Sequence, residues 1–130
     1  LLDRSAASHA RMRDTAAQVA ARATVLDDLA ESAVLIDLFE YPADLRIDLT
    51  ETMLHLQRAH DFVIVIARMG GGRRKLVVST DPDRSGLDLR AEFGLQGFAP
   101  FRVHVPAETL LARLPSARLA QALALPAPRG

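Results

Sequence analysis

The chain of 130 residues has no cysteine, no tryptophan and a single tyrosine. The absence of cysteine excludes disulfides, thiolate catalysis and zinc–thiolate sites. Sixteen basic and sixteen acidic residues cancel to a formal charge of zero, so no overall field attracts the chain to nucleic acid or anionic lipid. No run reaches the roughly 18 apolar residues that a membrane span needs. We therefore expect no nucleic-acid partner, and contact with a membrane only through segments outside this chain.

Hydrophobic residues make up 49% of the sequence and charged residues 25%. This balance is typical of a globular domain with one core. A length of 130 residues favours a single domain. Because the chain begins with Leu1 rather than with methionine, we expect it to be excised or processed from a longer protein.

The first third of the chain contains neither glycine nor proline between Ser5 and Phe39 and is rich in alanine, the best helix former. Apolar residues recur there at alternating spacings of four and three, which is the pattern of a coiled-coil seam. We predict one long helix over residues 1–40 and a homodimer joined along this seam. Packing of the helix on its own domain is the alternative. The seam comprises Met12, Ala16, Val19, Ala23, Leu26, Ala30 and Ala33.

A second helix is predicted within residues 41–61. Pro42 interrupts the first helix, because proline disfavours helical geometry in the residue before it. The alternation of apolar residues from Leu45 to Leu49 also fits a short strand. We favour a helix that ends near His60, since Asp48 and Glu51 have the spacing of a capping box at its start.

The apolar period changes at Phe62, where a β-branched run predicts a buried strand to Ala67. Lys75–Thr80 is predicted to be a second strand, and the glycine-rich segment between the two predicts an antiparallel hairpin. Residues 101–105 alternate between apolar and polar types, which predicts a third strand with one exposed face.

Two short helices are predicted at the end of the chain, over residues 106–114 and 116–125, with Ser116 as the N-cap of the second. The predicted fold class is therefore α+β. It comprises the long N-terminal helix, the second helix, a small antiparallel sheet over 62–105 and short helices over 106–125.

The glycine triplet at 70–72, followed by Lys75, suggests a phosphate-binding loop, but the pattern fails. Such a loop needs serine or threonine after the lysine and a helix behind it, whereas Leu76 follows Lys75 and begins an apolar strand. A plain hairpin tip is favoured. No serine lies in a nucleophile elbow and no histidine–glutamate zinc motif is present. We therefore predict neither an enzyme nor a cofactor.

The segment from Asp81 to Glu92 matches the spacing of a calcium-binding loop. Oxygen ligands stand at its positions 1, 3 and 5, which are Asp81, Asp83 and Ser85. Gly86 at position 6 permits the sharp turn, and Glu92 at position 12 would bind the ion bidentately. The residues before the loop are strand-like rather than helical, and these residue types also form ordinary turns. A turn without metal is favoured, and calcium is the alternative.

One succession of features within residues 54–89 is distinctive. It comprises a predicted helix that ends in Leu56-Gln57-Arg58-Ala59-His60-Asp61, the strand from Phe62, the hairpin, and a Ser-Thr-Asp-Pro stretch at 79–82 followed by Gly86 and Asp88-Leu89. This succession resembles a Cache-type sensor domain. The resemblance implies a long N-terminal helix that leads to a PAS-like antiparallel sheet. It also implies a ligand-sensing module on the extracytoplasmic face of a bacterial membrane protein, whereas a cytoplasmic location is the alternative.

The favoured function is a non-enzymatic ligand-sensing domain of a bacterial signal-transduction protein, with a small polar or anionic ligand. Arg102 and His104 are the candidate ligand-binding residues, because alternation places them on the exposed face of the third strand. An arginine there could bind a carboxylate through two hydrogen bonds. Phe101, Val103 and Val105 are predicted to face the core. The alternative function is a small soluble α+β interaction subunit that dimerises or docks through its N-terminal helix.

Overall fold

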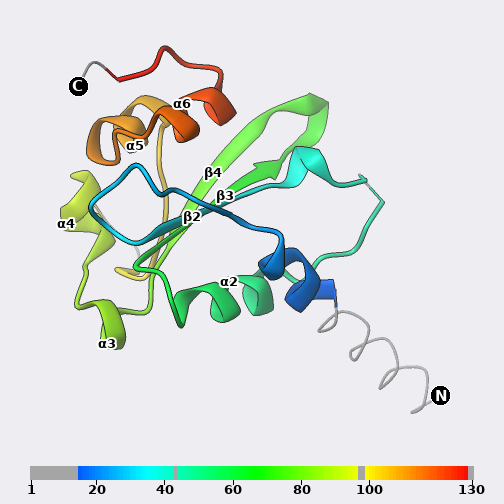
Figure 1. The fold of residues 1–130 in the computed structure, drawn as a ribbon, viewed down its shortest axis with the longest axis horizontal. Helices are drawn as coiled ribbons and strands as arrows, with labels where there is room; N and C mark the ends of the chain where they lie inside the picture. The colour runs from blue at the N-terminus through cyan, green and yellow to red at the C-terminus, as the bar shows by residue number, and fades with distance from the viewer. Residues whose placement is uncertain (1–14, 43, 97–98, 129–130) are drawn as a thin grey trace.

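A five-stranded sheet with helices on both of its faces forms the centre of the fold (Figure 1). The computed structural model describes residues 15–42, 44–96 and 99–128. The predicted α+β class is confirmed. Among the described residues, no helix is long and apolar enough to cross a bilayer.

The strands lie side by side in the order in which they follow one another along the chain. Strands β2 and β3 are parallel, whereas every other neighbouring pair is antiparallel. The predicted antiparallel pairing is confirmed for the three strands within 62–105. The sheet as a whole is mixed, because β2, which the sequence did not predict, pairs with β3 in parallel. The helix between β2 and β3 returns the chain to the same end of the sheet, as a parallel pair requires. The strands are β1 Thr24–Val25, β2 Ala33–Asp37, β3 Phe62–Arg68, β4 Arg74–Ser79 and β5 Arg102–His104.

Helices cover the two faces of the sheet unequally (Figure 1). One face is covered by α4 (Leu89–Phe93), α5 (Ala107–Arg113) and α6 (Ala117–Leu123). The other face is covered by α2 (Leu49–Gln57) and by the N-terminal helix, which spans 15–21 within the described residues. Three short helical turns join these elements: η1 Leu38–Glu40, η2 Gly70–Gly72 and α3 Pro82–Ser85.

The central strand β3 contributes alternate side chains to two hydrophobic cores. Phe62 and Ile64 pack with the leucines of α4, α5 and α6. Val63 and Val65 pack with α2 and with Val19 of the N-terminal helix. Because both faces are covered, the strand is a continuous apolar run rather than an alternating one.

Several local predictions are confirmed by the structure. The Asp48 side chain accepts a hydrogen bond from the Glu51 backbone N–H at the start of α2, and Ser116 caps α6 through the Leu119 N–H. The β3–β4 hairpin turns through the glycine triplet, in which Gly71 has a φ of +74°, a backbone conformation that glycine adopts without strain. The phosphate-loop pattern is thus a hairpin tip.

The predicted long helix is wrong beyond residue 21. After the N-terminal helix the chain enters β1 and then β2, so the segment predicted to finish the helix instead forms a strand. The apolar run Val34–Ile36 is buried on both faces of the sheet. A polar turn over 27–32 connects the two strands, and aspartate and serine there are turn formers. Residues 1–14 of the predicted helix lie outside the described residues.

The predicted dimer seam is not a stripe on one helix. Ala16 and Val19 lie on the N-terminal helix and are buried within the fold of the same chain. The other described members are dispersed, since Ala23 precedes β1, Leu26 follows it, Ala30 lies in the turn and Ala33 begins β2. Met12 lies outside the described residues. A continuous coiled-coil seam is therefore wrong, and the homodimer itself stays a prediction.

Candidate functional site

A cavity of about 300 Å³ lies at the edge of the sheet, where β2 extends beyond Thr24, the first residue of β1. We call it the edge cavity and define it by five of its lining residues: Arg22, Asp37, Glu40, Tyr41 and Arg118. They come from the end of the N-terminal helix, the end of β2, the turn η1 with the residue after it, and α6. The cavity thus joins segments that are far apart in the sequence.

Arg22 contributes a guanidinium that is held against an aromatic ring. Its Cζ lies 5.2 Å from the centre of the Tyr41 ring, within the range of a cation–π contact. Tyr41 is buried, whereas Arg22 is exposed. The contact therefore restrains the arginine at the cavity wall while leaving its N–H groups open to solvent.

The position of Arg118 is set by the capping of α6. Asp28, in the turn between β1 and β2, accepts a hydrogen bond of 2.7 Å from Ser116 Oγ and one of 2.8 Å from the Ala117 backbone N–H. The hydrogen bond from Ser116 is the main cause that lowers the pKa of Asp28. A carboxylate at a helix N-terminus is also favoured by the helix dipole. The turn 27–32 thereby fixes the helix that carries Arg118.

A second contact holds the same turn against the neighbouring helices. Arg113 of α5 pairs with Glu31 of the turn, and its Nε and Nη2 lie 2.9 and 2.7 Å from Glu92 Oε2 of α4. Its Cζ also lies 5.3 Å from the centre of the Phe62 ring. The hydrogen bond with Arg113 lowers the pKa of Glu31, and that with Glu31 raises the pKa of Arg113. We call Glu31, Glu92 and Arg113 the carboxylate clamp.

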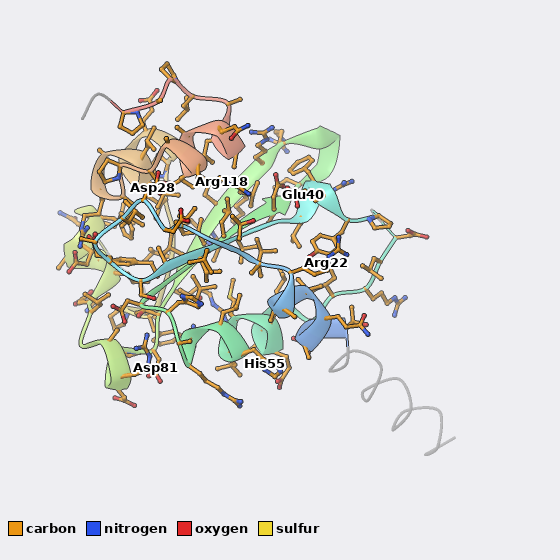
Figure 2. All side chains as sticks on the ribbon, in the orientation of Figure 1. Arg22, Asp28, Glu40, His55, Asp81 and Arg118 are labelled. Atoms are coloured by element: carbon orange, nitrogen blue, oxygen red, sulfur yellow. The ribbon has the colours of Figure 1, made fainter. Side chains whose placement is uncertain are left out.

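The charged groups of the edge cavity, in contrast, form no ion pair with any residue that the structure describes. Among the described residues, neither Arg22 nor Arg118 has a carboxylate within 4.0 Å. The exposed Glu40 forms no ion pair within that part of the chain either. Asp37 accepts a hydrogen bond of 2.9 Å from the Phe39 N–H at the start of η1. Figure 2 shows Arg22, Glu40 and Arg118 in one region, between α6 and the N-terminal helix.

The predicted ligand residues Arg102 and His104 lie on β5, at the opposite edge of the sheet. Both are exposed and share the face that α2 covers, since they pair with Ser79 and Val77. Arg102 and His104 together line a pocket of about 570 Å³ at this edge. Arg102 also lines a groove of about 520 Å³ beside α2, which His104 does not reach.

The chemistry of the β5 pair differs from that of the edge cavity. Burial, with Lys75 and Arg102 nearby, lowers the pKa of His104, which favours the neutral imidazole. Val103 and Val105 are buried as predicted, but Phe101 is 48% exposed, because β5 begins only at Arg102. The prediction that Phe101 faces the core is wrong.

The sequence pattern did not identify Arg22 or Arg118. Arg22 lies within the predicted long helix over 1–40, and Arg118 lies within a predicted short helix with no motif around it. Their proximity depends on the pairing of β1 with β2 and on the capping of α6. No spacing within the sequence indicates either contact.

The predicted calcium ligands do not come together. Asp81 caps α3, where its Oδ1 accepts a hydrogen bond from the Asp83 N–H. Ser85 Oγ donates to the Asp81 carbonyl at 2.9 Å, and Glu92 is bound to Arg113. Within the described ranges, no group of three or more acidic or histidine side chains could hold a metal ion. The segment forms a helical turn in which the four predicted ligands do not converge, and calcium binding there stays a prediction.

No family model, no curated protein and no solved structure matches this chain.

Proposed function

We propose that this chain is a non-enzymatic ligand-sensing domain of a bacterial signal-transduction protein, and that it binds a small polar or anionic ligand in the edge cavity. The observation that carries the proposal is the convergence of Arg22 and Arg118. Two guanidinium groups from distant segments line one cavity, and neither has an ion-pair partner among the described residues.

Arginine suits this role because its planar guanidinium binds a carboxylate through two parallel hydrogen bonds. The stacking of Arg22 on Tyr41 reduces the conformational entropy that the side chain loses when a ligand binds. Glu40 and Asp37 line the same cavity and can accept hydrogen bonds from a positive group. The cavity volume of about 300 Å³ is at the low end for small-molecule sites, so the ligand should be small.

Two further features support a sensor. Arg22 directly follows the N-terminal helix, so a ligand bound to its side chain contacts the end of the segment that leads into the domain. The proposal of a bacterial signalling protein with an extracytoplasmic location rests only on the sequence resemblance of residues 54–89 to Cache-type domains. The long helix and the purely antiparallel sheet that this resemblance implies are not found in the described residues. The competing proposal, an interaction subunit that docks through its N-terminal helix, has less support, since Ala16 and Val19 are already buried within the chain.

A thermal-shift screen of the whole chain against acetate, succinate and free amino acids tests this proposal. A ligand at a hundredfold excess over its Kd stabilises the folded state by about 2.7 kcal/mol, which raises the Tm of a domain of this size by several degrees. We expect the double variant Arg22→Gln/Arg118→Gln to lose this shift. The matched control Arg102→Gln, at the opposite sheet edge, should retain it.

The outcomes separate the site from the function. A ligand-induced Tm shift that is lost in Arg102→Gln and kept in the double variant would show that the ligand binds at β5. A Tm shift that persists in all variants would show that the ligand binds at neither site. No shift with any of the probes would contradict the proposed function.

A further inference from the structure

The edge of β2 beside the cavity is only partly paired. On its other edge β2 pairs with β3 over its whole length, from Ala33 to Asp37. On the β1 side the pairing extends only from Val34 to Leu35, with one further hydrogen bond of 2.9 Å from the Leu26 N–H to the Ala33 carbonyl. The rest of this edge, Ile36 and Asp37, forms a wall of the edge cavity.

The backbone of Asp37 is turned toward this cavity. In an antiparallel pair, alternate residues direct both their N–H and C=O groups to the same neighbouring strand. The hydrogen bond to Ala33 places Ala33 in the set directed at β1, and Leu35 and Asp37 belong to the same set. Asp37 keeps an extended backbone, with φ −104° and ψ 107°.

Among the described residues, no strand pairs with β2 at this position. Before Thr24, the backbone turns out of the plane of the sheet into the N-terminal helix, where the Ala23 N–H donates to the Ala20 carbonyl at 3.2 Å. Residues from both faces of the sheet line the cavity, with Leu35 from one core and Ile36 and Tyr41 from the other. The cavity therefore lies in the plane of the sheet, where a further stretch of β1 would stand.

From this geometry we propose that the ligand is a short extended peptide that pairs with the backbone of Asp37 as an added piece of strand. The inference rests on the proposed function and specifies its ligand class. A peptide supplies the amide N–H and carbonyl that a strand edge can bind. Its terminal carboxylate matches Arg22 and Arg118, and its terminal ammonium matches Glu40.

The size of the cavity limits the length of the peptide. About 300 Å³ is available, and Asp37 is the last residue of β2, so one residue pair can form there. The edge therefore fits two or three peptide residues rather than a long strand from another protein. Side chains on such a peptide alternate between the two faces, toward Tyr41 on one side and toward α6 on the other.

The experiment titrates the whole ¹⁵N-labelled chain by NMR with dialanine and three matched probes. Alanine keeps both termini but has no peptide bond, alanyl-lactate replaces the peptide N–H by an ester oxygen, and succinate offers carboxylates alone. We expect dialanine to bind about threefold to tenfold more tightly than alanine or alanyl-lactate, the effect of one or two hydrogen bonds. The amide resonance of Asp37 should shift with dialanine and should stay in place with succinate.

Equal affinity for dialanine and alanyl-lactate would overturn the inference, and so would an Asp37 amide resonance that dialanine does not move. Binding of succinate that depends on Arg22 and Arg118, with no binding of dialanine, would overturn the peptide class but leave the proposed function intact. If none of the four probes binds, both the peptide class and the proposed function are contradicted. The spectra also report directly whether the Arg22→Gln/Arg118→Gln variant is folded.

Discussion

Two arginines on neighbouring helices, Arg113 of α5 and Arg118 of α6, have opposite surroundings. Arg113 binds two carboxylates and lies over the ring of Phe62. Arg118 lines the edge cavity and has no ion pair among the described residues. The contrast shows that residue type alone does not mark a binding site. An arginine whose donors are satisfied within the fold stabilises it, whereas one without partners can bind a ligand.

The two regions are connected through the turn 27–32. Asp28 of this turn caps α6, which carries Arg118, and Glu31 belongs to the carboxylate clamp. The clamp therefore holds in place the segment that positions the cavity. Stability should depend on the clamp and ligand binding on the cavity, and this division can be tested.

The largest expected effect on stability is that of Arg113→Met. The substitution keeps the packing of the side-chain stem but leaves Glu31 and Glu92 without their shared cation. Because the three side chains are 26–31% exposed, water screens part of the loss. We expect the free energy of unfolding in urea to fall by about 2 kcal/mol.

The matched control is Arg118→Met. It should change the free energy of unfolding by less than about 0.5 kcal/mol, as is usual for an exposed residue without specific contacts. Equal losses of unfolding free energy in the two variants would show that the clamp does not stabilise the fold more than the cavity arginine does.

A smaller effect is expected from acid. The hydrogen bond with Arg113 lowers the pKa of Glu31 from its ordinary value of 4.5, so the folded state binds this proton more weakly than the unfolded state. The resulting stabilisation is fully present above that ordinary value and is lost as the pH falls through the lowered pKa of the folded state.

The variant Glu31→Gln isolates this contribution. Asp28 also has a lowered pKa, but it titrates in both proteins and cancels in their difference. We expect the stability advantage of the unmodified chain over Glu31→Gln to shrink as the pH falls from about 5 toward 3, measured by urea unfolding. A difference that does not change with pH would contradict the role assigned to the Glu31–Arg113 pair.

The parts of the fold that the sequence predicted correctly have signals confined to a few neighbouring residues. The cap of α2 needs only Asp48 and Glu51, and the hairpin tip needs only its glycines. The run Val34–Ile36 has no such signal. An apolar run of this length fits a buried strand or a buried helix segment equally well, and its place in β2 depends on pairing with β3, whose residues come much later in the chain.

The candidate site was harder to predict for the same reason. Arg102 and His104 could be placed on one exposed face because strand alternation is local. Arg22 and Arg118 meet only through tertiary contacts, namely the capping of α6 by Asp28 and the stacking on Tyr41. Sequence spacing therefore located a plausible arginine on the sheet but not the two arginines that share a cavity.

The smallest expected effect is that of calcium. The clamp engages Glu92 through Arg113, and Asp81 caps α3, so these carboxylates do not share a metal position. Weak extracellular calcium modules bind with dissociation constants of about 10⁻⁴–10⁻³ M. Calcium at about 10 mM would therefore raise the Tm by several degrees if such a loop formed, and we expect a shift below about 1 °C in a thermal melt with magnesium as the ionic control. A rise in Tm that is specific to calcium and that Asp81→Asn abolishes would contradict this expectation. It would show that Glu92 can leave Arg113 to bind the ion, so that Glu92 is not committed to the clamp.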